Sequence, residues 1–128
     1  MFCDRISIDD SALVTIGDNV SIGPGVQLIT LNHPTDVELR LTGVMYALPI
    51  SIGNACWIGS RATILPGASI GQGCTIGACA VVSGHIPEYS VAVGNPARVV
   101  KRVFPVPKDT ESTNRTETGA EQSALDEK

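Results

Sequence analysis

The sequence predicts an all-β protein, a β-helix of triangular coils. Three observations predict it: branched apolar residues recur every six positions, glycine follows most of them, and aromatic residues make up only 4% of the chain although hydrophobic residues make up 43%. An amphipathic helix cannot produce this pattern, because six is not close to a multiple of 3.6 and repeated glycine opposes helix formation. Short strands can produce it, with three six-residue units closing one coil.

The six-residue frame occupies two stretches of the chain. The distance in sequence between its members Leu28 and Ile52 is a whole multiple of six, so the register is kept across the interruption. Side chains alternate in direction along a strand, so positions one and five should face inward, while Gly and Asn should supply the unusual backbone angles of the turns. Position one holds Ile16, Ile22, Leu28, Ile52, Ile58, Ile64, Ile70, Ile76 and Val82; position two holds Gly17, Gly23, Gly53, Gly59, Gly71 and Gly77; position five holds Val20, Val26, Cys56, Ala62, Ala68, Cys74 and Ala80.

The frame divides the chain into one domain, expected at residues 4–103, and a tail. Residues 29–49 leave the frame as a long loop, and loops on rigid scaffolds often carry function. Residues 97–103 are expected to form a short strand or a turn of helix over the end of the coil. Residues 104–128 are mostly polar and charged, so a disordered acidic tail is expected there.

Charge and hydropathy exclude two classes of partner. The formal net charge is −4, and residues up to Val103 carry 6 basic and 7 acidic side chains, so the basic excess needed for general nucleic-acid binding is missing. No apolar run approaches the roughly 20 residues of a membrane span, and no signal-peptide pattern is present. A soluble cytoplasmic protein without nucleic-acid or membrane partners is therefore expected.

Three motifs, in order along the chain, carry a family resemblance. The Ile-Gly-x-x-small-x repeat resembles that of the hexapeptide-repeat acyltransferases, and the segments TLNHP (30–34), PISIGNACWIG (49–59) and GNPAR (94–98) resemble the maltose and galactoside O-acetyltransferase branch. The resemblance implies a left-handed parallel β-helix, a homotrimer with sites between subunits, acetyl-CoA as co-substrate, a sugar-like small acceptor and no metal. Members of this branch carry a helical segment before the coil, and this chain is expected to lack it.

His33 is the strongest candidate for a catalytic residue. Acyl transfer to a hydroxyl needs a base, and an imidazole in the loop can accept a proton at neutral pH. A lone loop histidine is, from spacing alone, more often simply solvated. The resemblance places the family's catalytic histidine on His33, whereas His85 is expected to be an exposed residue without a role.

Two residues are candidates for acceptor binding. Asp10, beside Asp9, matches the acidic position that contacts the acceptor in the family, but a turn residue that bonds its own backbone is an equal alternative. Met45, followed by Tyr46, fits an apolar wall for the acceptor, and packing against the coil is equally compatible with its sequence. The family's Asn before the acidic residue is not evident here.

The donor groove is assigned by the resemblance to small residues beside the only tryptophan. Trp57, Gly59, Ser60 and Ala78 match its lining, since a pantetheine arm must run close to the backbone. The Ser60 backbone N–H is the candidate oxyanion donor.

The nucleotide end of the groove departs from the family pattern. Ser83 replaces the usual Thr and Gly84 replaces the usual Lys, which removes one positive contact to the phosphates. Arg98 and Lys101 remain as phosphate ligands. Ordinary solvated charges near a domain end are the alternative for both.

The cysteines do not indicate a metal site. Cys56 and Cys74 occupy the small inward position of the repeat and are expected to be buried packing residues, and no Cys-x-x-Cys motif is present. The sequence therefore predicts an acetyl-CoA-dependent O-acetyltransferase with His33 as general base. The alternative is a truncated, non-catalytic hexapeptide-repeat trimer that acts as a scaffold.

Overall fold

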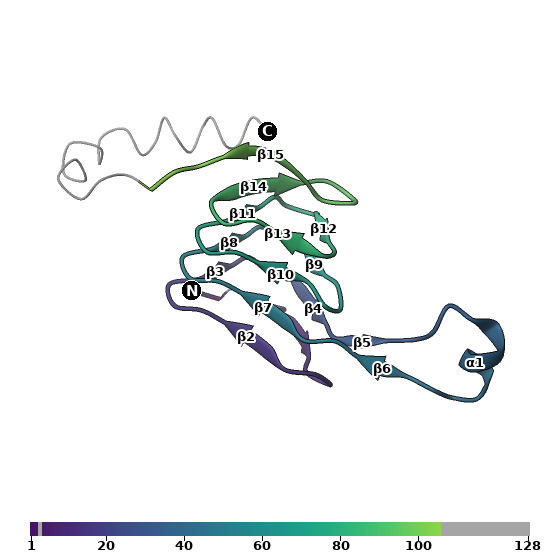
Figure 1. Cartoon of the computed structure of the whole chain (residues 1–128). Coiled ribbons are helices and arrows are strands. Elements are labelled where there is room, and N and C mark those ends of the chain that lie inside the picture. The colour runs from purple at the N-terminus through teal and green to yellow at the C-terminus, as the bar shows by residue number, and fades with distance from the viewer. Residues whose placement is uncertain (3, 106–128) are drawn as a thin grey trace, which may run out of the picture.

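Three sheets form the sides of a triangular coil (Figure 1). The structure is a computed structural model that describes residues 1–2 and 4–105. The first sheet holds β1 (Ser7–Asp9), β4 (Gln27–Ile29), β9 (Thr63–Ile64) and β12 (Val81–Val82). The second holds β2 (Val14–Ile16), β7 (Ile50–Ile52), β10 (Ser69–Ile70) and β13 (His85–Ile86). The third holds β3 (Ser21–Ile22), β8 (Trp57–Ile58), β11 (Thr75–Ile76), β14 (Ser90–Val93) and β15 (Arg98–Arg102).

The strand register shows that one coil contains three units of the repeat. Ser51 pairs in parallel with Ser69, which lies three repeat units further along the chain. Ser21 pairs with Trp57, at twice that separation, because the loop insertion lies between them. The insertion therefore adds the length of one whole coil and leaves the ladder unbroken, as the kept register predicts.

The core is a column of aliphatic and small side chains inside the triangle. Ile58 and Ile64 are fully buried, and position-five residues such as Ala62 and Cys56 lie beside them. The prediction that positions one and five face inward is confirmed. Each coil buries this column only against its neighbours, so no bulky ring is needed to fill the interior.

The glycines at position two are required for space and not for backbone angle, which corrects the expectation from the sequence. None of the six has a positive φ. A Cβ on Gly53 would lie 2.6 Å from the Gln72 N atom of the next coil, a distance that real Cβ atoms do not show. The left-handed residue is at position four, where it turns each corner; it is Asn19, Gly25, Ala55, Arg61, Gly67, Gly73 or Cys79.

The inserted loop is a projecting arm, residues 30–49 (Figure 1). Its two strands, β5 (Leu31–Asn32) and β6 (Tyr46–Ala47), pair in antiparallel fashion. At its far end lies the helix α1 (Val37–Leu41), which the sequence analysis does not predict. The Asp36 carboxylate caps this helix by accepting a hydrogen bond of 2.9 Å from the Leu39 N–H, and the helix buries no residue.

The chain leaves the coil through β15, which is a strand and not a turn of helix. It runs antiparallel to β14, whereas the other pairs of the third sheet are parallel. The expected tail lies from residue 106 onward outside the described residues. Within the described part of the chain, no helix is long and apolar enough to cross a membrane.

Two substitutions in one turn, one that removes a glycine and one that introduces a glycine, test the different roles of positions two and four. Gly53→Ala should lower the free energy of unfolding by about 1–3 kcal/mol, because the new Cβ overpacks against Gln72. Ala55→Gly should raise it by about 0.5–1 kcal/mol, because Ala55 has a φ of 57°. Urea midpoints at one protein concentration measure both changes. A stabilising Gly53→Ala would contradict the close-approach argument.

Candidate active site

Most of the predicted site residues lie on two corners of the coil, and the others lie on strands of the third sheet: Trp57 on β8, and Arg98 and Lys101 on β15. The arm corner joins the first sheet to the second and consists of residues 10–13, the arm, and residues 65–68 and 83–84. The Gly59 corner joins the third sheet to the first and consists of residues 23–26, 59–62 and 77–80. Residues 94–97, which connect β14 to β15 within the third sheet, hydrogen-bond to Val81 directly after this corner. The first sheet separates the two corners.

His33 lies on the arm directly after β5, and its side chain is exposed. Its backbone N–H donates to Asn32 Oδ1 at 2.9 Å, which fixes the backbone at this point. The arm strands pair Leu31 with Ala47 and Asn32 with Tyr46, so the same register continued by one residue sets His33 opposite Met45. His33 and Met45 thus lie directly after β5 and directly before β6, on the two sides of the arm.

Met45 and Tyr46 lie at the end of the returning side of the arm, and both are exposed. Met45 is 56% exposed and Tyr46 is 42% exposed. An apolar side chain is therefore accessible from solvent on the same arm as His33.

Asp9, and not Asp10, is the turn residue. The Asp9 Oδ1 atom accepts hydrogen bonds from the Ser11 N–H (3.1 Å) and the Ser11 hydroxyl (2.7 Å), and Oδ2 accepts one from the Leu31 N–H (2.8 Å). The Ser11 hydroxyl, the Leu31 N–H and the Ser11 N–H hold the pKa of the Asp9 carboxyl below its ordinary value. Sequence reasoning missed this role, although the spacing of Asp9 and Ser11 is that of an Asx-turn.

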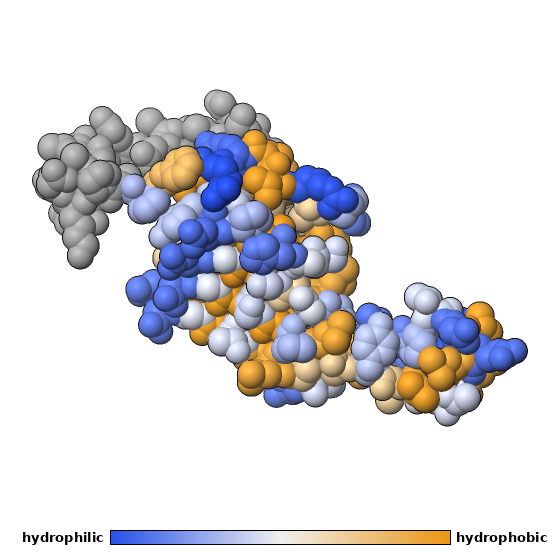
Figure 2. Space-filling view, in the orientation of Figure 1, coloured by the Kyte–Doolittle hydropathy of each residue, from blue (hydrophilic) through white to orange (hydrophobic). Residues whose placement is uncertain are grey.

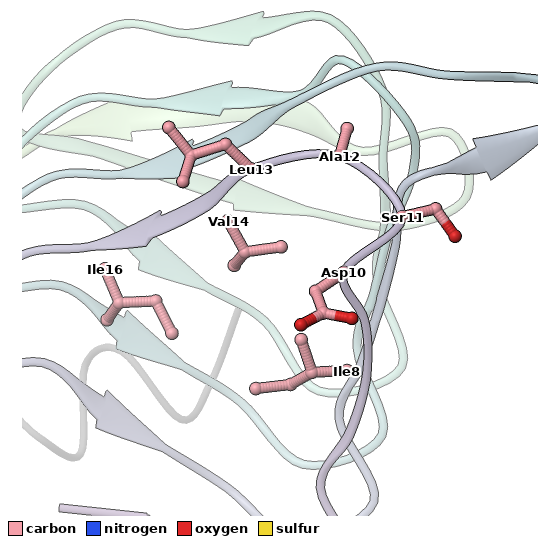
Figure 3. Close-up of a pocket in the computed structure, with 7 residues that line it drawn as sticks. All are labelled: Ile8, Asp10, Ser11, Ala12, Leu13, Val14 and Ile16. Carbon is pink, nitrogen blue, oxygen red and sulfur yellow. The ribbon is translucent and has the colours of Figure 1, made fainter.

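Asp10 is left free by this arrangement. Its side chain makes no hydrogen bond to any residue that the structure describes, and its carboxylate points into an open pocket next to Ile8, while Ser11 points away (Figure 3). The pocket lies at the outer edge of the first coil. The rest of its lining is Ala12, Leu13, Val14 and Ile16, so one carboxylate faces a mostly apolar wall.

The Gly59 corner presents backbone and small side chains. Gly59 is buried, and a Cβ there would lie 2.7 Å from the Ala78 N atom. Ser60 and Ala78 are exposed, and their N–H groups donate to no acceptor within residues 1–2 and 4–105. Trp57 points outward from β8, 38% exposed, with Ser21 and Thr75 as strand neighbours. The corner therefore offers two backbone N–H donors without an acceptor among the described residues, and the close approach of Gly59 to Ala78 joins two neighbouring coils.

The two basic candidates lie on β15, in the same sheet as Trp57. Arg98 is exposed, and its Nη1 atom donates to the Ala97 carbonyl at 3.0 Å; Lys101 is half-buried. Ser83 lies elsewhere, on the arm corner, and Gly84 next to it has a φ of 74° with open space around its Cα. Ser83 therefore shares a corner with Asp10 and His33 and not with Trp57.

The remaining titratable candidates have structural surroundings. His85 is exposed on β13, as the sequence analysis expects, and its Nδ1 atom lies 3.4 Å from the Ser69 hydroxyl. Cys56 and Cys74 are buried free thiols that donate to the carbonyls of Gly71 and Pro87. The neighbouring Cys74 side chain and burial raise the pKa of Cys56. Among the described residues, no group of three His, Cys, Asp or Glu side chains could hold a metal ion.

Comparison with known proteins identifies the family. Residues 49–84 match the family model "Bacterial transferase hexapeptide (six repeats)". A crystal structure of a maltose O-acetyltransferase from Clostridium difficile 630 is 34% identical, superposes with a TM-score of 0.73, and is covered over 67% of its length by 81% of this chain. The chain belongs to the hexapeptide-repeat acyltransferase family.

Further relatives place this hexapeptide-repeat chain in the maltose and galactoside O-acetyltransferase branch, whose fold is the left-handed parallel β-helix. The galactoside O-acetyltransferase of Escherichia coli K12 is 48% identical over 99 residues, which are 77% of this chain and 49% of the relative. A galactoside acetyltransferase structure in complex with coenzyme A is 47% identical with a TM-score of 0.75, over 77% of this chain and 50% of that one. The chain thus spans about half the length of these two relatives.

The depressed pKa of Asp9 gives a stability effect with a defined sign. A carboxyl whose pKa is lower in the folded than in the unfolded state stabilises the fold above its unfolded pKa, and this contribution is lost as the pH falls through the folded value. Asp9→Asn should therefore lower the urea midpoint at about pH 7, and the deficit should shrink towards about pH 3. A deficit that grows on acidification would contradict the assignment.

Proposed function

We propose that this hexapeptide-repeat protein is an acetyl-CoA-dependent O-acetyltransferase that acts on a hydroxyl of a sugar or a similar small acceptor. The observation that carries the proposal is the exposed His33 at the base of the arm, opposite Met45 and two residues beyond the hydrogen bond to Asp9. The names of the two galactoside acetyltransferase relatives, one of them bound to coenzyme A, support the donor and the acceptor class.

The complete site is proposed to form between copies of the chain in a homotrimer. Its candidate residues are divided between the arm corner and the Gly59 corner, which lie at opposite ends of the strands of the first sheet. A threefold arrangement would set the arm corner of one copy against the Gly59 corner of the next.

The arm supports this assembly. Figure 2 shows apolar residues on the surface of the projecting arm. In the helix at its end, Leu41 is 80% and Val37 is 56% exposed. A projecting element with unburied apolar side chains fits a protein interface better than contact with water. The arm of one copy is therefore proposed to lie along its neighbour.

In the proposed reaction, His33 takes the proton of the acceptor hydroxyl as its oxygen attacks the thioester carbonyl carbon. The new C–O bond forms, the C–S bond breaks, and the proton on His33 passes to the leaving sulfur of coenzyme A. The Ser60 N–H, with no acceptor among the described residues, would donate to the developing oxyanion.

The other site residues bind the two substrates in this proposal. Asp10 would accept a hydrogen bond from an acceptor hydroxyl, and Met45 would contact the apolar face of the acceptor. Trp57 and Ala78 would line the pantetheine arm, which would run past the backbone at Gly59 and Ser60.

The phosphates of the donor would contact basic residues of only one of the two copies that form a site. Arg98 and Lys101 on β15 would bind them. Ser83 would contact the donor from the arm corner of the neighbouring copy, where Gly84 offers no positive charge.

Matched histidine variants test the role of His33. His33→Ala should lower kcat about 10²- to 10⁴-fold, because the general base is removed. His85→Ala, which removes an exposed histidine on another face, should leave kcat unchanged. Release of the coenzyme A thiol, measured with acetyl-CoA and a panel of sugars, reports both.

Unchanged turnover in His33→Ala would remove His33 from the mechanism. An equal loss in the two variants would assign the effect to general disturbance of the fold. Absence of transfer to every hydroxyl compound by the unaltered protein would overturn the proposed function itself.

A further inference from the structure

The base of the arm is held to the turn at residues 9–12 by hydrogen bonds outside the regular ladder. The parallel pairing of β1 with β4 ends at Asp9 and Ile29. Beyond this pair, the Leu31 N–H donates to the Asp9 carboxylate at 2.8 Å, where a backbone carbonyl would accept in a continued ladder. The Asp9 side chain thus fixes the position of Leu31, where the chain leaves the coil.

Thr30 completes the connection. Its side chain is fully buried; its hydroxyl donates to the Asp9 carbonyl at 2.9 Å and accepts from the Ala12 N–H at 3.0 Å. Its own carbonyl accepts from the Leu48 N–H at 2.9 Å, which ties the returning side of the arm to the same point. Thr30 therefore holds both the outgoing and the returning side of the arm, and it is the residue directly before Leu31.

The two oxygens of the Asp9 carboxylate have separate partners. Oδ1 closes the turn through Ser11, and Oδ2 holds the arm through Leu31. Asp10 follows directly in the chain, and His33 is two residues beyond Leu31. One carboxylate therefore sets the position of the candidate acceptor residue relative to that of the candidate base.

We propose that Asp9 is a positioning residue for the reaction: it latches the arm so that His33 is held at a fixed position relative to Asp10. The inference rests on the proposed function, in which His33 is the general base. The arm itself has only two β5–β6 pairs, and α1 buries no residue, so its orientation is determined at its base.

Asp9→Asn tests the latch with almost no change of shape. The amide nitrogen cannot accept, so either the Leu31 N–H or the donors of Ser11 lose their partner. Misplacement of His33 should lower kcat about 10- to 100-fold. The KM for acetyl-CoA should stay unchanged, because the hydrogen-bond partners of Asp9 (Ser11, Thr30 and Leu31) are not among the residues proposed to bind the donor. Asp18→Asn is the matched control, since Asp18 is exposed at the corner formed by residues 17–20 and carries the same chemical change.

A double variant separates positioning from general stability. If Asp9 acts through His33, Asp9→Asn should cause no further loss of kcat in the His33→Ala protein. Equal fold losses in the two backgrounds, or an unchanged kcat in Asp9→Asn alone, would overturn the proposal.

Hydrogen exchange gives a readout that does not depend on activity. The amide of Leu31 should exchange faster in Asp9→Ala, which removes both acceptor oxygens, than in the unaltered protein or in Asp18→Ala. Unchanged exchange at Leu31 would overturn the latch even if activity fell. Faster exchange in a protein that transfers no acetyl group would support the latch and refute the proposed function, so the two failures are distinguishable.

Discussion

The close contact of each coil with the next is the constraint on which the rest of the structure depends. Position two of the repeat lies so near the backbone above it that a Cβ on Gly53 or Gly71 would come within 2.6 Å of a backbone nitrogen. This close approach allows the strands of successive coils to pair in parallel, and it buries the aliphatic side chains in a column inside the triangle. The low aromatic content follows from the same constraint, because a coil of three short units has room for Ile, Val, Ala and Cys and little room for rings.

A rigid coil allows one corner to carry a long insertion. The arm adds the length of one coil between β4 and β7, yet Leu28 still pairs with Ile64 as if the insertion were absent. The insertion lies at a corner, between two strands, where it does not interrupt the pairing of neighbouring coils. The candidate chemistry lies at the corners: His33 and Asp10 on one, Ser60 and Ala78 on another.

The six-residue period predicts the coil, the positions that face inward and the outward direction of Trp57. It can do so because side chains alternate between the inside and the outside along each strand, and this alternation depends only on the position within the repeat. It misassigns the purpose of the position-two glycines, since the space above a residue depends on a neighbouring coil that is distant in the sequence. It also misses the role of Asp9, whose partner Leu31 becomes a neighbour only once the strand register is known. The short helix α1 has too few residues to show a period.

Because the candidate residues occupy two corners of one chain, the central claim is that catalysis needs two copies. Mixed trimers test it directly: His33→Ala chains refolded together with Ala78→Trp chains, whose groove is blocked. Each variant alone should be inactive, and an equal mixture should recover about a quarter of the unaltered activity, since half of the arms and half of the grooves are intact. A mixture as inactive as its components would contradict the account.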